Sequence, residues 1–198
     1  MSSQLITSEE GPVSRGSSVA ASAGLGVFAA ALGYLVTYLL IGSEVREVAG
    51  DDVATWKGVA WYFYSAHLVD LEVSSSFGPF GGTGTVNLIA ESSAANADLL
   101  YVVPPLVLLG AGALLSLRLN ATDFGEAVAI GAPVTIGYAV VMGLGALVAE
   151  SSGTLSAGIG ISESITPATV PAVLLGGILY PLVFAPIGAA LALLFADR

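Results

Sequence analysis

Four long apolar runs are the main feature of this chain, and polar segments separate them. None of the runs contains Asp, Glu, Lys or Arg, and each is 19 to 26 residues long. Crossing the hydrocarbon core of a bilayer takes roughly 20 apolar residues in a helix. We therefore predict an all-α membrane protein, a bundle of four transmembrane helices. The four runs are residues 19–42, 99–117, 127–149 and 170–195.

Prolines and small residues within these runs predict details of the bundle. Pro104 and Pro105 come early in the second run, where a missing backbone donor costs least. Pro181 and Pro186 are expected to kink the fourth helix. A face of small residues in the first run is expected to let a second helix approach closely. That face consists of Ala20, Gly24 and Gly33.

The polar segments divide the chain into a tail and one membrane domain. We predict a disordered tail over residues 1–17, followed by a single integral membrane domain over 18–198. The longest polar region, 43–98, is predicted to be extracellular. Within it, glycine, serine and proline predict a loop over 74–85, and 86–90 could form a short strand or a helical turn. The segment before the fourth run is a polar connector rich in glycine and serine.

The extracellular region contains a predicted amphipathic helix, residues 53–73. One face of it repeats at spacings of three and four, which is typical of a helix. Its uncharged part, 58–69, is twelve residues long and too short to cross the membrane. Tryptophan and tyrosine favour the headgroup region, so we predict an interfacial helix between the first two spans; a re-entrant helix stays open. The face consists of Val53, Trp56, Ala60, Phe63 and His67.

This helix holds the candidate functional or interfacial residues. Tyr64, His67 and Asp70 lie three residues apart on one helical face, so they could form a hydrogen-bonded chain. A carboxylate there would favour the protonated imidazole and create a pH-sensitive switch. The alternative is a histidine that only satisfies a structural hydrogen bond. The candidates are Trp56, Trp61, Tyr64, His67 and Asp70.

The composition supports a membrane protein and excludes several functions. Hydrophobic residues make up 55% of the chain, and the mean hydropathy is +0.87. The absence of cysteine excludes disulfides and thiolate metal sites, and a single histidine argues against zinc, so we expect no metal or cofactor. No HExxH or GxSxG motif occurs, and we expect no enzymatic activity. A net charge of −10 excludes a basic surface for nucleic acid.

The positive charges predict the orientation. With the N-terminus inside, the cytoplasmic segments carry Arg15, Arg118 and Arg198, whereas the exterior carries Arg46 and Lys57. Positive charges close to the ends of the spans favour the cytoplasmic side. We therefore place the chain in the cell membrane as a multi-pass protein with both termini in the cytoplasm.

The segment Trp61-Tyr-Phe-Tyr-Ser-Ala-His-Leu-Val-Asp70 lies between the first span and three later ones. It resembles a family of haloarchaeal multi-pass membrane proteins of unknown function, which share a W-x-F/Y-Y-x-A-H-F/L-V pattern. The resemblance covers most of the chain from Ala20 onward, and it implies a membrane location and a salt-loving source. The excess of 15 acidic over five basic residues fits that source, because dense carboxylates keep a surface hydrated when water is scarce. The family supplies no catalytic residues.

Two functions are compatible with these features. The four runs contain no ionisable side chain except tyrosine, and intramembrane charges usually mark ion or proton paths. We therefore predict a structural or partner-binding component, whose partners are the lipid bilayer and a membrane protein or a second copy of the chain. The alternative is a small-solute transporter or channel subunit, because spans interrupted by proline and glycine can expose carbonyl groups to a cavity.

Overall fold

The computed structural model describes residues 15–49, 53–77, 80–94, 96–155 and 161–196. In these residues four helical segments are long and apolar enough to cross a membrane, and they coincide with the four predicted spans. The segments extend beyond the uncharged runs at one or both ends, because a helix can continue into polar residues after it leaves the hydrocarbon. They are residues 19–48, 97–119, 124–148 and 169–195.

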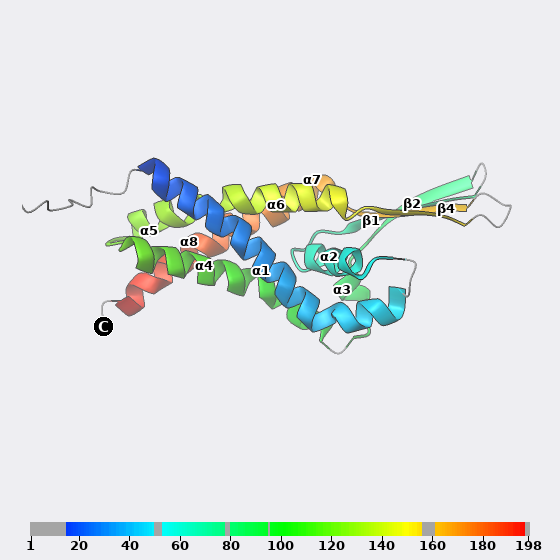
Figure 1. Ribbon diagram of the computed structural model, residues 1–198, viewed down its shortest axis with the longest axis horizontal. Helices are drawn as coiled ribbons and strands as arrows, with labels where there is room; N and C mark the ends of the chain where they lie inside the picture. Colours follow the sequence, from blue (N-terminus) through cyan, green and yellow to red (C-terminus); the bar gives the residue numbers. More distant parts are fainter. Residues whose placement is uncertain (1–14, 50–52, 78–79, 95, 156–160, 197–198) are drawn as a thin grey trace, which may run out of the picture.

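The first span belongs to a helix that is longer than a bilayer core is thick. Helix α1 (Arg15–Ala49) has 35 residues, or about 52 Å at 1.5 Å per residue, against a core of about 30 Å. Its last turns therefore project past the other spans and support the short helix α2 (Figure 1). The start of α1 overlaps the end of the tail predicted over 1–17; residues 1–14 lie outside the described part.

In the second and third spans, prolines lie where a helix begins or breaks. A 3-10 helix, η1 (Ala97–Val102), leads into α4 (Val103–Leu119). Pro104 and Pro105 occupy the first turn of α4, as predicted. The third span consists of α5 (Phe124–Gly131) and α6 (Val134–Val148), and Pro133 lies at the break between them. Proline lacks the N–H that a continuous helix would need at that point.

The fourth span changes its winding along its length. After the single turn α7 (Thr169–Pro171), the π-helix η2 (Ala172–Leu179) continues into α8 (Tyr180–Ala196). The wide turns end at Leu179, two residues before Pro181, whose ring would clash with a carbonyl one turn earlier in an α-helix. Pro186, by contrast, lies inside the continuous helix α8.

A four-stranded sheet corrects the expectation of an all-α fold. Its strands are β1 (Leu71–Phe77), β2 (Phe80–Val86), β3 (Ser151–Leu155) and β4 (Ile161–Pro167). They pair antiparallel in the order β2-β1-β4-β3. The sheet extends beyond one end of the helices (Figure 1). Two segments predicted as a loop and a connector are therefore hairpins, and their pairing with each other satisfies backbone groups that glycine-rich loops would leave to water.

The predicted helix over 53–73 is also shorter than expected. Helix α2 covers only Thr55–Ser65, and Leu68 has a left-handed backbone with φ of 58°. This residue turns the chain, which then enters β1 at Leu71. A short helix, α3 (Leu88–Glu91), follows β2, and Asn87 caps it by accepting from two backbone N–H groups. Residues 86–90 thus contain both a strand end and a helical turn.

Glycines decide where the helices cross. A Cβ atom on Gly26 of α1 would overlap the carbonyl oxygen of Val134 in α6. At the crossing of α4 with α8, a Cβ atom on Gly112 would overlap the carbonyl oxygen of Ala185. Gly24, predicted to be part of the packing face, has nothing within 4 Å of such an atom. Backbone therefore touches backbone at these crossings, as small residues allow in membrane bundles.

Candidate functional site

His67 lies at the centre of the protein, in the turn after α2. Its side chain is fully buried. Nδ1 is 2.7 Å from the carbonyl oxygen of Phe63, and Nε2 is 2.8 Å from the hydroxyl oxygen of Tyr138 in α6. A carbonyl oxygen can only accept, so Nδ1 carries a proton, and in the neutral imidazole the Tyr138 hydroxyl then donates to Nε2. Both ring nitrogens therefore have a hydrogen-bond partner.

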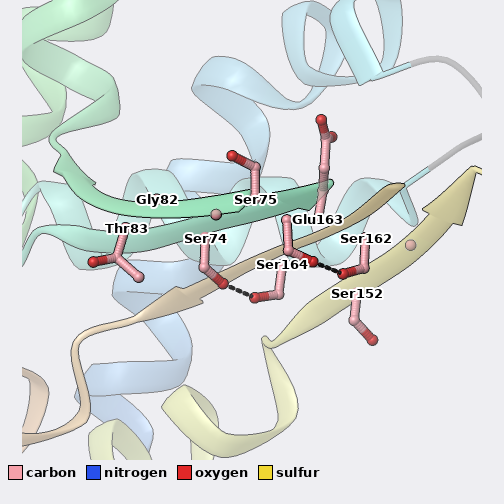
Figure 2. A pocket seen from close by; sticks show the side chains of 11 residues that line it. Ser74, Ser75, Gly82, Thr83, Ser152, Ser162, Glu163 and Ser164 are labelled. Atoms are coloured by element: carbon pink, nitrogen blue, oxygen red, sulfur yellow. Dashed lines mark hydrogen bonds between the residues drawn. The ribbon is translucent and has the colours of Figure 1, made fainter. Parts of the chain in front are cut away.

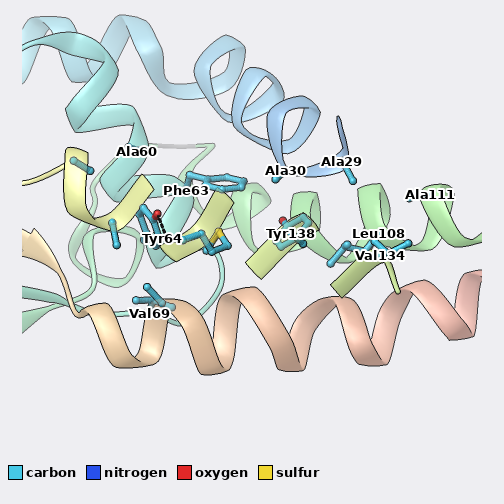
Figure 3. Close-up of a cluster of buried hydrophobic side chains, with 14 of the residues drawn as sticks. Ala29, Ala30, Ala60, Phe63, Tyr64, Val69, Leu108, Ala111, Val134 and Tyr138 are labelled. Atoms are coloured by element: carbon cyan, nitrogen blue, oxygen red, sulfur yellow. Dashed lines mark hydrogen bonds between the residues drawn. The ribbon is translucent and has the colours of Figure 1, made fainter. Parts of the chain in front are cut away.

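Aromatic rings surround this imidazole. The ring centroids of Phe63, Tyr138 and Tyr180 lie 4.7, 5.7 and 5.1 Å from that of His67. Figure 3 shows Phe63 and Tyr138 between α1 and the fourth span. Burial lowers the pKa of His67 to about 4, because an apolar surrounding disfavours the charged ring. At neutral pH the uncharged imidazole therefore contacts residues of α2, α6 and α8.

The other two members of the predicted hydrogen-bonded chain lie elsewhere. The Tyr64 hydroxyl donates to the carbonyl oxygen of Met142 at 2.6 Å. Burial raises the pKa of Tyr64, so its hydroxyl stays protonated as a donor. Asp70 is exposed, and its backbone carbonyl accepts from Ala168 where β1 and β4 leave the bundle. The Tyr64–His67–Asp70 chain does not form because the helix ends at Ser65 and the turn redirects the chain.

Two side chains of α2 also form hydrogen bonds with the backbone at the end of α6. The Trp61 indole N–H donates to the carbonyl oxygen of Ala149 at 2.8 Å, and the Lys57 ammonium donates to that of Glu150 at 2.5 Å. The last carbonyls of a helix have no partner within it, so these two side chains satisfy them just before β3 begins. Trp56, which is 44% exposed, takes no part in this contact. It carries the Lys57 ammonium 5.7 Å above its ring.

A second candidate surface is one face of the sheet, which we call the hydroxyl face. Residues alternate between the two faces of a strand, and the register places serine or threonine at most positions of this face. Ser74 and Ser164 form a hydroxyl–hydroxyl hydrogen bond of 2.6 Å, as do Ser76 and Ser162. Figure 2 shows these side chains on the face opposite Ser75 and Glu163. The hydroxyl face comprises Ser74, Ser76, Thr83, Thr85, Ser152, Ser162, Ser164 and Thr166.

The hydroxyl face borders a hollow of about 770 Å³. A signal for it was present in the sequence, since β4 reads Ile161-Ser-Glu-Ser-Ile-Thr166 and alternates as a half-buried strand does. The alternation of Gly82-Thr-Gly-Thr85 in β2 is a second signal. Glycine and serine are also typical of turns, and that composition outweighed the alternation.

The described residues contain no metal-binding cluster, since no group of three or more histidine, aspartate or glutamate side chains there could hold a metal ion. Ser65, two residues before His67, accepts a hydrogen bond from the backbone N–H of Leu88. The described contacts of His67 are its two hydrogen bonds and the aromatic rings packed around it.

One family model matches nearly the whole chain, including the segments that form the buried histidine site and the sheet. The model of the family of unknown function DUF7978 matches residues 1–196. The chain belongs to this family. No curated protein and no solved structure gives a significant match. Membership agrees with the expected resemblance to a membrane-protein family of unknown function, while the haloarchaeal source stays a prediction.

Proposed function

We propose that this DUF7978 protein is a structural, partner-binding component of the cell membrane, and that its projecting sheet is the binding surface. The observation that carries this proposal is the pair of outer strands, β2 and β3, whose outer edges pair with no other strand of the described residues. Each presents a row of backbone donors and acceptors that a further strand can satisfy. The hydroxyl face adds many small donors and acceptors whose short side chains cost little entropy to immobilise, and Glu72 shares this face.

The packing of the helices supports this function over transport. At its glycine crossings the bundle brings backbones into contact, which leaves no space there for a solute path. The four described cavities have volumes of about 290, 490, 510 and 770 Å³, and none is lined by residues from all four spans. His67 is neutral and enclosed, so it is poorly placed to gate a water-filled vestibule. We therefore rank a transporter or channel subunit second.

The proposed orientation puts the sheet outside the cell. The start of α1 and the end of α8 lie at the end of the bundle opposite the sheet (Figure 1). Arg15 and Arg118 lie near that end, and positive charges near spans favour the cytoplasm. The sheet would then face the medium, where its carboxylates Glu72 and Glu163 suit a salt-rich environment.

Single cysteines test the orientation and the binding surface in one experiment, because the natural chain has none. Thr83 is exposed on the outer strand β2 and belongs to the hydroxyl face, and Thr122 is exposed in the turn between α4 and α5. In sealed cells, an impermeant maleimide should label Thr83→Cys and leave Thr122→Cys unlabelled. A photoreactive maleimide on Thr83→Cys should then give a discrete cross-linked polypeptide after illumination.

Lysed cells provide the control, because both cysteines become accessible there. Labelling of Thr122→Cys in sealed cells would show that the orientation is reversed. If photolysis at Thr83→Cys gives no adduct beyond that at Thr122→Cys in lysed cells, the sheet is not a binding surface and the proposed function is wrong.

A further inference from the structure

The two outer strands of the sheet lack the features that normally prevent edge-to-edge association. Natural edges carry charged residues, proline or bulges, whereas β2 and β3 contain no charged residue and no proline. The acidic residues of the sheet, Glu72 and Glu163, lie on its two central strands. In a chain with a net charge of −10, this distribution keeps carboxylates off both edges, so two copies can approach there without repulsion between acids.

The connections fix the direction of each strand relative to the membrane. Strand β3 continues outward from the end of α6, and β4 returns to the fourth span. Strand β1 likewise leaves the bundle after α2, and β2 returns to α3. The outer strands β2 and β3 therefore run in opposite directions, one toward the membrane and one away from it.

The membrane limits how two copies can meet. All copies have the same orientation in a bilayer, so a symmetric assembly has its rotation axis along the membrane normal. Such a rotation preserves the inward or outward direction of a strand. Two β2 strands would then be parallel, whereas β2 of one copy and β3 of another are antiparallel, as every pair in this sheet is. The contact is heterologous, so one copy can pair with a neighbour at each of its two edges.

Building on the proposed function, we infer that the partner of the sheet is a second copy of this chain. Strand β2 of each copy pairs with β3 of the next, so the sheets continue edge to edge outside the membrane. A copy with a neighbour on each side has both of its edges paired, which no single added strand achieves.

The register supports this pairing. Through the four strands, Ser152 is level with Ser164, Ser74 and Thr83. Likewise, Ser151 is level with Gly84 of β2. When β2 and β3 of neighbouring copies meet at the same height, the hydroxyl face continues across the seam. A shift by two residues preserves this match, whereas a shift by one would break it.

Disulfide formation between copies tests the seam. Within one copy, β2 and β3 are separated by two strands, so Thr83 and Ser152 are about 14 Å apart at 4.8 Å per strand. A disulfide needs Cα atoms within about 7 Å, and only a neighbouring copy can supply that. We would co-express two differently tagged full-length chains in membranes, one with Ser152→Cys and one with a cysteine on β2. The β2 positions are Gly81, Thr83 and Thr85, which cover shifts of two residues.

Mild oxidation should give a mixed disulfide with both tags for one of the three β2 positions, and no dimer for either cysteine variant alone. The double variant Ser74→Cys/Ser164→Cys is the matched control, since these residues face each other within one sheet and should form an intrachain disulfide.

Two outcomes would overturn the inference. Dimers of a single β2 variant alone would indicate a β2–β2 contact instead. Absence of any mixed disulfide, while the control closes, would show that copies do not meet at this seam. In that case a cross-link from Thr83→Cys to a different polypeptide would leave the proposed function intact, and absence of both cross-links would reject the two together.

Discussion

Gly112→Ala and Gly26→Ala are each expected to prevent the bundle from closing, although each adds only one methyl group. The new Cβ atom would overlap a backbone carbonyl oxygen of the neighbouring helix, that of Ala185 or Val134. Overpacking a core typically costs about 1–3 kcal/mol, and more when nothing can move aside. Here the obstacle is main chain, which cannot change rotamer, so relief requires two helices to separate.

Each of these glycines has a matched control two residues earlier. Gly110 in α4 and Gly24 in α1 have nothing within 4 Å of an added Cβ atom. Gly110→Ala and Gly24→Ala should therefore fold normally and could gain up to about 1 kcal/mol, because alanine favours the helix over glycine. Thermal unfolding and size-exclusion profiles in mild detergent at high salt would compare the four variants. Equal stability within each pair would contradict the backbone crossings.

These crossings show what the sequence can and cannot reveal. Glycine-rich spans indicate close packing, and four spans follow directly from the uncharged runs. Which glycine meets a neighbour depends on the rotation of each helix about its axis. A helix that is apolar on all sides has no distinct apolar stripe, so its sequence does not indicate which side faces the bundle. In the small face predicted over Ala20, Gly24 and Gly33, Gly33 packs against Phe63, but Gly24 is wrong because Gly26 is the glycine that contacts α6.

The sheet could not be predicted for a different reason. Its two hairpins are separated by the second and third spans, and the central pairing of β1 with β4 joins residues about 90 positions apart. Local signals in these segments describe turns, since glycine and serine are common there. The strands are stable because each hairpin supplies the backbone partners that the other lacks. Only β4 carries enough alternation to have indicated a strand by itself.

Among the candidate residues, contacts within α2 could be predicted from the sequence, whereas contacts with other spans could not. Phe63 and His67 share a face four residues apart as predicted, and their backbone–imidazole hydrogen bond reflects that spacing. The decisive partner, Tyr138, comes from a span 71 positions away, and no local pattern points to it. Trp61 was a candidate for its aromatic character, whereas its role is to cap the end of α6.

The second large effect is expected at the His67–Tyr138 pair. Tyr138→Phe keeps the ring and removes the hydroxyl, so the buried Nε2 loses its donor. Leaving a buried acceptor unsatisfied costs about 1–3 kcal/mol. His67→Ala should cost more, since it orphans the Phe63 carbonyl and the Tyr138 hydroxyl and also leaves a cavity. His67→Gln retains a donor and an acceptor and should fall between the wild type and His67→Ala.

Tyr62→Phe is the matched control for the loss of a tyrosine hydroxyl. Tyr62 lies on the same helix α2, is half-buried, and has no side-chain hydrogen bond among the described residues. Its variant should stay within about 0.5 kcal/mol of the wild type, as surface changes usually do. Denaturant titration in detergent, followed by tryptophan fluorescence, would rank the variants. If Tyr138→Phe is no less stable than Tyr62→Phe, the buried hydrogen bond does not support the fold.

Acid is expected to lower the stability of the folded protein through His67. The pKa of His67 is about 4 in the folded protein and about 6.5 in an unfolded chain, so the unfolded state binds a proton that the folded state does not. The stability due to the neutral imidazole is full above pH 6.5 and falls as the pH decreases toward 4. Each unit of difference in pKa corresponds to about 1.4 kcal/mol. Carboxylates also titrate in this range, so the informative quantity is the wild type minus His67→Gln. That difference should shrink on acidification, and a constant difference between pH 7 and pH 4 would show that His67 does not titrate on unfolding.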